Sequence, residues 1–113
     1  MRVVNQTKQV VIGHSIKVAD NFFTRLVGLL ATKHLRSGGG LMITPCSSIH
    51  TLGMRFPIDV LFVDASHNVL KVVEGIMPGR LAAAAKAAYV IELPQGTAAA
   101  TSTQAGDKLL LDA

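Results

Sequence analysis

The chain has 113 residues, half of them apolar, and a formal net charge of +4 with neutral histidines. This apolar content argues against intrinsic disorder, and a chain of this length typically forms one domain. A single cysteine excludes an internal disulfide framework and suits a reducing compartment. We therefore expect one folded domain over residues 1–113, located in the cytoplasm.

The distribution of charged residues argues against two classes of partner. The first residues contain no apolar signal-peptide region, and the uncharged stretch from Ser37 to Met54 includes three consecutive glycines and a proline, which make burial in lipid costly. The Lys and Arg residues are spread along the chain and do not cluster with aromatic residues, as they do in many nucleic-acid-binding proteins. We expect a soluble protein that binds neither a membrane nor a nucleic acid.

Short apolar runs separated by turn residues predict a mainly β protein. The expected strands, in chain order, are residues 3–4, 10–12, 16–18, 41–43, 58–63, 69–73, 89–93 and 108–111. Apolar residues spaced by three and four predict one main helix at about Asp20–Ala31, and residues 97–105 suit a short second helix. The Ala-rich segment Leu81–Ala88 fits a helix, a strand or a loop. The pattern favours a compact antiparallel β-sandwich or open barrel.

An aspartate lies inside the apolar run of residues 58–63. Strand side chains alternate, so Asp59 points away from the face of Ile58, and both faces of this strand are apolar. A buried carboxylate must be paired or hydrogen-bonded, or its pKa rises until it is neutral. We expect Arg55 or His50 to be its partner.

Cys46, Ser48 and His50 fall on one face of an extended segment just before this strand. A thiol or hydroxyl, an imidazole and the carboxylate of Asp59 are the parts of a nucleophilic or acid–base site. Structural interpretations compete with this one, because free cysteines are often simply buried and a His50–Asp59 pair can hold a turn together. The chain contains no Cys-x-x-Cys or His-x-x-x-His pattern, so we expect no metal and no cofactor.

The central stretch and its flanks resemble a known family. The segments that carry the resemblance are Gly40–Cys46, Ser48–Thr51, Met54–Val60 and Val90–Pro94. On these segments the chain is similar to the DUF192 (UPF0127) family over nearly its whole length. The resemblance implies a mainly β sandwich or barrel with a helix after the first strands. It implies no established activity, so it assigns no catalytic residue.

The family's shared motif marks where a site would lie. Here it falls on Ser48, His50, Thr51, Met54, Arg55, Pro57 and Asp59. The aromatic residue that usually follows the His-Thr pair is replaced by Leu52-Gly53, which changes the turn or the wall of a pocket.

The leading hypothesis is a small β domain that binds a small polar or anionic ligand beside this motif. The ligand-binding candidates are Ser48, His50, Thr51, Met54, Arg55 and Asp59. In this hypothesis Arg55 recognises a carboxylate or phosphate, and His50 and Ser48 orient it. Met54 and Leu52 form an apolar wall.

Two alternatives come from other classes of protein. The first is a hydrolase or lyase in which His50 is the general base, Asp59 orients it, and Ser48 or Cys46 is the nucleophile. The second is a protein-interaction module in which the motif is purely structural and an exposed apolar patch or strand edge binds the partner.

Overall fold

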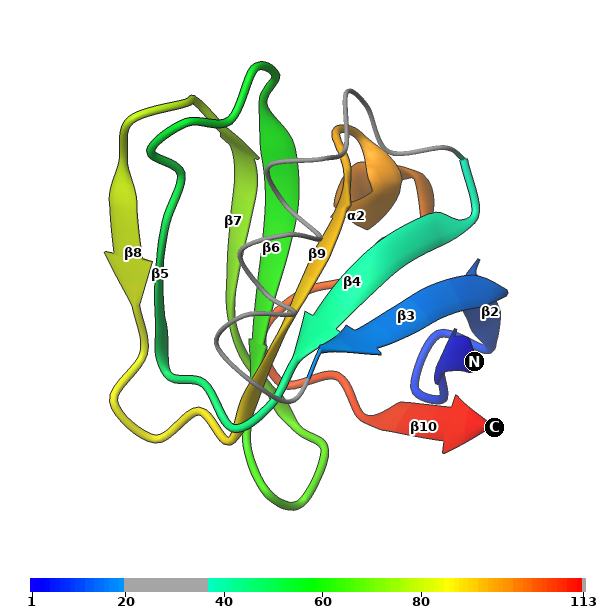
Figure 1. Ribbon diagram of the computed structural model, residues 1–113. Helices are drawn as coiled ribbons and strands as arrows, with labels where there is room; N and C mark the ends of the chain where they lie inside the picture. Colours follow the sequence, from blue (N-terminus) through cyan, green and yellow to red (C-terminus); the bar gives the residue numbers. More distant parts are fainter. Residues whose placement is uncertain (20–36, 113) are drawn as a thin grey trace.

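The computed structural model describes residues 1–19 and 37–112. In this part of the chain, ten strands form three sheets, and one short helix, α2 (Thr97–Ala100), accompanies them (Figure 1). The main helix predicted at Asp20–Ala31 lies outside the described residues. No helix among the described residues is long and apolar enough to cross a membrane.

A five-stranded sheet forms the middle of the molecule. Its strands follow the order β3 (Ser15–Ala19), β4 (Gly39–Ile43), β9 (Tyr89–Pro94), β6 (Ile58–Val63) and β7 (Val69–Ile76). β6 and β7 form the antiparallel hairpin that the polar residues between them predict. β3 and β4 pair in parallel, which differs from the antiparallel expectation. Parallel neighbours need a crossover of about a dozen residues or more, and residues 20–38 provide that length.

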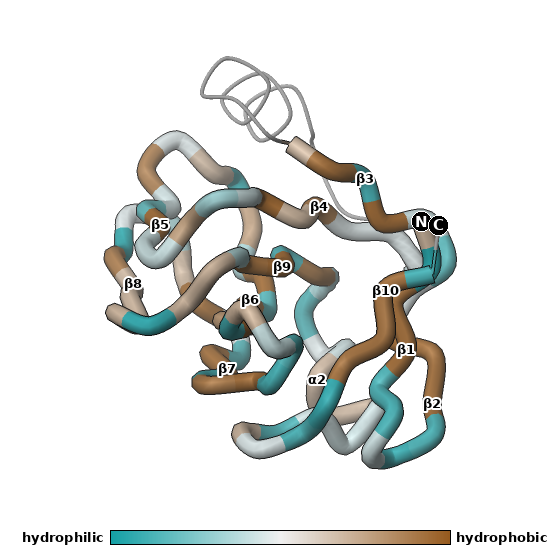
Figure 2. The backbone as a smooth tube through the Cα atoms, turned by 90° about the horizontal axis from the view of Figure 1, so that it is seen from below, coloured by the Kyte–Doolittle hydropathy of each residue, from teal (hydrophilic) through white to brown (hydrophobic). Residues whose placement is uncertain are grey.

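Two smaller sheets cover the two faces of the central sheet. One contains β10 (Leu109–Asp112), β1 (Arg2–Asn5) and β2 (Val10–Gly13), and the other contains β5 (Ser48–His50) and β8 (Leu81–Ala83). Val3 and Leu109 pack with Leu61 on the first face, whereas Ile49 packs with Phe62 on the second. Figure 2 shows the two small sheets on opposite sides of β6 and β9. These layers confirm the mainly β sandwich.

β6 is the strand that places the motif aspartate. It lies between β9 and β7, and all six of its residues are buried. This confirms the prediction of a strand with two apolar faces. Leu61 and Val63 pack toward the three-stranded sheet, while Val60 packs toward β5. Asp59 therefore shares the face of Leu61, on the side away from β5.

The run of three glycines leads into β4. Gly39 and Gly40 are already strand residues. A side chain at Gly40 would have no room, because its Cβ would lie 2.6 Å from the carbonyl oxygen of Glu92 on β9. The glycine therefore allows two central strands to approach closely.

Candidate functional site

Asp59 is fully buried and binds backbone amides. Its Oδ1 accepts a hydrogen bond from the amide of Gly75 at 2.8 Å, and its Oδ2 accepts from the amides of Gly96 at 3.0 Å and Ala98 at 2.9 Å. Three donors satisfy the carboxylate and tie β6 to β7 and to the start of α2. Asp59 is thus a fixed part of the core.

The expected partners of Asp59 lie elsewhere, because strand alternation turns its side chain toward α2. His50 belongs to β5, which covers the opposite face of the sheet, and its side chain is exposed. Arg55 is exposed as well. Among the described residues, neither makes a hydrogen bond to Asp59, so the expected pairing is wrong.

Thr51 is fully buried, and its polar atoms also form hydrogen bonds with the backbone. Its Oγ1 donates to the carbonyl oxygen of Met77 at 2.7 Å and accepts from the amide of Arg80 at 2.8 Å. Its own amide donates to the carbonyl oxygen of Arg80 at 2.9 Å. These bonds join the end of β5 to the turn that precedes β8, and they leave Thr51 no free group for a ligand.

Ser48 and His50 share one exposed face of β5, while Ile49 between them is buried, so their placement follows the predicted alternation. The thiol of Cys46 donates to the carbonyl oxygen of Ser48 at 3.0 Å. Within the described residues, no hydrogen bond connects His50 with Cys46 or with the hydroxyl of Ser48. The nucleophile, base and carboxylate of the enzyme hypothesis are therefore not assembled.

Met54 is half-buried and packs against the core cluster that contains Ile49 and Phe62. Its amide donates to the carbonyl oxygen of Thr51 at 3.2 Å. The neighbouring Arg55 is exposed. The motif thus divides into buried residues that hold the fold and residues that are exposed at the surface.

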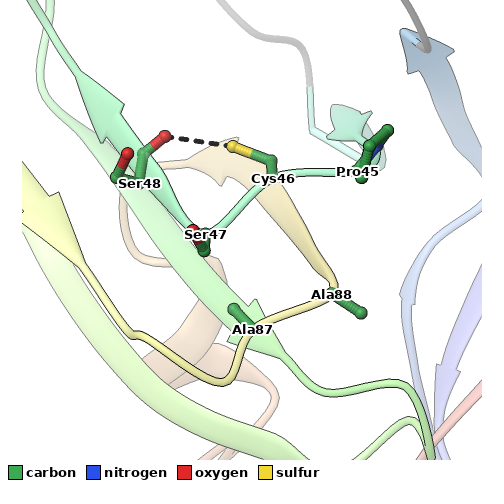
Figure 3. A pocket seen from close by; sticks show the side chains of 6 residues that line it. All are labelled: Pro45, Cys46, Ser47, Ser48, Ala87 and Ala88. Atoms are coloured by element: carbon green, nitrogen blue, oxygen red, sulfur yellow. Dashed lines mark hydrogen bonds between the residues drawn. The ribbon is translucent and has the colours of Figure 1, made fainter.

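An open hollow lies where the motif begins. It has a volume of about 480 Å³ and is lined by Pro45, Cys46, Ser47, Ser48, Ala87 and Ala88, which we call the Cys46 hollow (Figure 3). Two of the predicted site residues, Cys46 and Ser48, line it. The other wall comes from the loop after β8, which is held by a hydrogen bond from the amide of Cys46 to the carbonyl oxygen of Ala88 at 3.1 Å. No sequence signal distinguished those alanines, because their role depends on this long-range contact.

A second hollow, of about 440 Å³, lies beside α2. Lys8, Glu74 and Gln104 are among the residues that line it. Lys8 is already committed, because its Nζ binds Asp107 Oδ2 at 2.9 Å. Burial would raise the pKa of Asp107, but hydrogen bonds from Asn5 and Lys8 outweigh burial and hold that pKa below its usual value. This network joins the first and last strands.

Glu92 is a buried carboxylate at a position that the sequence pattern predicts only as part of a strand. It lies on β9 opposite Leu41 of β4 and Val60 of β6, and it is fully buried. Among the described residues its two carboxylate oxygens have no hydrogen-bond partner. Burial raises the pKa of Glu92 from 4.5 to about 7. The described residues contain no cluster of ligands that could hold a metal ion.

Comparison with known proteins fits this fold and motif. The family model DUF192, described as "Uncharacterized ACR, COG1430", matches residues 3–111. The chain belongs to the DUF192 family. A UPF0127 protein from Pyrococcus abyssi is 33% identical over 115 residues, which cover 95% of this chain and 94% of the relative.

Two crystal structures resemble this DUF192 chain in fold. A protein of unknown function from Novosphingobium aromaticivorans has a TM-score of 0.81 at 19% identity, covering 97% of this chain and 82% of the other. A protein from Sinorhizobium meliloti, suggested to be a transcription regulator, has a TM-score of 0.80 at 19% identity, covering 96% and 89%. At this identity the likeness shows the fold alone.

Proposed function

We propose that this DUF192 domain binds a small polar molecule in the Cys46 hollow. The observation that carries the proposal is the composition of one wall, where Cys46, Ser47 and Ser48 are consecutive and all line the hollow. Its volume of about 480 Å³ lies within the roughly 300–1,000 Å³ that small-molecule sites occupy. The proposed site excludes two residues of the sequence motif, Asp59 and Thr51, because their side chains form hydrogen bonds with the backbone.

The lining suits a polar ligand with a small apolar part. Each serine hydroxyl offers one donor and two acceptor positions, so it can bind a carboxylate, a phosphate or a hydroxyl group. Pro45, Ala87 and Ala88 form the apolar side of the hollow. Lys86 is exposed directly before Ala87, which favours an anionic ligand over a cationic one.

Two other functions receive less support from the described residues. An enzyme of the proposed kind needs a base beside its nucleophile, and the thiol of Cys46 instead donates to a backbone carbonyl. Nucleic-acid binding is suggested only by the description of the Sinorhizobium meliloti protein, whose likeness to this chain is one of fold.

A thermal-shift screen tests the proposal with inorganic phosphate, short carboxylic acids and sugar phosphates as probes. A compound that binds the native state raises the unfolding midpoint of the wild-type protein by mass action. We expect Ser48→Ala and Cys46→Ala to remain folded and to lose most of this shift. Ser66→Ala, at an exposed serine in the β6–β7 turn, is the matched control and should respond like wild type. The proposal fails if no probe shifts wild type, or if Ser48→Ala and Cys46→Ala respond as Ser66→Ala does.

A further inference from the structure

Three large apolar side chains stand out from one end of the two-stranded sheet. Leu81 is 80% exposed, Leu52 is 61% exposed and Met77 is 54% exposed. Leu81 begins β8, Leu52 lies in the turn after β5, and Met77 precedes the turn into β8. We call these three residues the apex. Side chains this exposed project from the surface instead of lining a groove.

The hydrogen bonds of Thr51 bring the apex together. Thr51 precedes Leu52, and it bonds to the carbonyl oxygens of Met77 and of Arg80, the residue before Leu81. Figure 1 shows the end of β5, the start of β8 and the connection from β7 at the same end of the molecule. The apex residues are therefore neighbours in space although they come from separate segments.

Every charge in these segments is positive. Residues 51–57 and 77–83, which form this end of the sheet, contain Arg55 and Arg80, both exposed, and no Asp or Glu. The acidic residues that flank these segments point elsewhere: Asp59 is buried, and Glu74 lines the hollow beside α2. Exposed apolar side chains with arginines nearby fit a partner whose interior is apolar and whose surface is anionic.

We propose that the apex docks on an anionic lipid surface, with Leu52, Met77 and Leu81 entering the interface and the arginines contacting headgroups. A second copy of this chain would bring like charges together, so it does not fit this face. A stable protein interface buries about 800 Å² on each partner, more than three side chains supply, whereas a soft bilayer needs no matching groove. The expectation of no membrane partner rests on the lack of a segment that could lie in lipid. A peripheral contact of this kind needs no such segment.

Strand addition by a peptide is the other way to use this sheet, and the edge of β8 is poorly suited to it. β8 has only three residues, and the carbonyl oxygen of Ala83 already accepts from Nζ of Lys71 at 3.1 Å. Too few backbone groups remain for a ladder of hydrogen bonds.

Tryptophan fluorescence tests insertion directly, because the chain contains no tryptophan. In Leu81→Trp the new indole is the only one in the chain and emits at longer wavelength than Tyr89, and we expect its emission to shift to shorter wavelength when phosphatidylserine-containing vesicles are added. Pure phosphatidylcholine vesicles should cause no shift. Leu110→Trp on β10, where the native side chain is 47% exposed, is the matched control and should stay unshifted. An unshifted Leu81→Trp, or equal shifts at both positions, overturns the proposal.

Vesicle co-sedimentation tests the charges and separates lipid from other anionic partners. We expect Arg80→Gln to weaken binding to the phosphatidylserine vesicles about fivefold, and Leu52→Ser to weaken it about tenfold. Lys108→Gln, at an exposed lysine beside β10, should bind nearly as wild type does. Equal losses for Arg80→Gln and Lys108→Gln contradict the proposal. Binding to polyglutamate or duplex DNA as tightly as to vesicles, with no shift in the emission of Leu81→Trp, also contradicts the proposal.

Discussion

Asp59 and Glu92 lie on neighbouring strands, and both carboxylates are fully buried, but they face opposite sides of the sheet. Asp59 faces β7 and the start of α2, which offer three amide donors. Glu92 faces apolar neighbours, and among the described residues it has no donor. The environment of each carboxylate follows from the face on which alternation places it, so the two respond differently to mutation.

Asp59→Ala should destabilise the protein severely. The change leaves three amides without acceptors in the core, which we expect to cost roughly 3–5 kcal/mol of the free energy of unfolding. Chemical denaturation measures this loss. His50→Ala removes an exposed side chain and should change the stability by less than about 0.5 kcal/mol. A loss in His50→Ala as large as that in Asp59→Ala would contradict the prediction that the exposed His50 contributes little to stability.

Glu92→Gln should remove a pH dependence of stability. Glu92 holds its proton up to about pH 7 in the folded protein, whereas its ordinary pKa is 4.5. The unfolded chain therefore binds fewer protons between these values, and wild-type stability falls as the pH rises through this window. The difference between the two pKa values corresponds to roughly 3 kcal/mol of the free energy of unfolding. This contribution is lost by about pH 7, and the free energy of unfolding does not change further above that pH on account of Glu92. Denaturation at several pH values should show this slope in wild type and not in Glu92→Gln; the same slope in both would contradict the assignment.

The β5–β8 sheet is the element that carries the exposed part of the motif. Its two strands have three residues each, and it packs on the central sheet through Ile49 and Ala82. Such a small sheet has little stability of its own and depends on its connections. Thr51 supplies the connection at one end, and the bond from Cys46 to Ala88 supplies it beside the hollow.

Thr51→Val should loosen this element while the central sheet stays intact. Valine keeps the shape of threonine but leaves the amide of Arg80 and the carbonyl of Met77 without their side-chain partner, a loss of about 1–3 kcal/mol. Hydrogen exchange should show faster exchange at the amide of Arg80, with little change in the strands of the central sheet. Ser48→Ala, on the exposed face of the same sheet, is the control. Unchanged exchange at Arg80 would show that Thr51 does not hold the turn.

The whole molecule joins segments that are far apart in the sequence. β1 pairs with β10, and Asn5 Nδ2 binds Asp107 Oδ2 at 2.9 Å, so the first and last strands close one layer together. The parallel pair of β3 and β4 and the covering β5–β8 sheet are also long-range arrangements. The two hollows lie where such segments meet, between Cys46 and Ala88 and between Lys8 and Gln104.

The sequence by itself determined the features that depend on local pattern. Alternation of apolar residues predicted most of the strands, the burial of β6 on both faces and the common exposed face of Ser48 and His50. It also placed a carboxylate in the core at position 59 and required that it be satisfied. These features depend on neighbours within a few residues, where side-chain direction follows from the backbone.

Only the tertiary structure decided which groups meet. The partners of Asp59 are three amides from β7 and the start of α2, not His50 or Arg55. Glu92 has no hydrogen-bond partner among the described residues. Ala88 lies beside Cys46. The tertiary structure also brought the segment of Leu52 beside that of Leu81, through the hydrogen bonds between Thr51 and Arg80. Such contacts depend on strand order and on the face that each sheet covers, and one sequence pattern is compatible with several such arrangements.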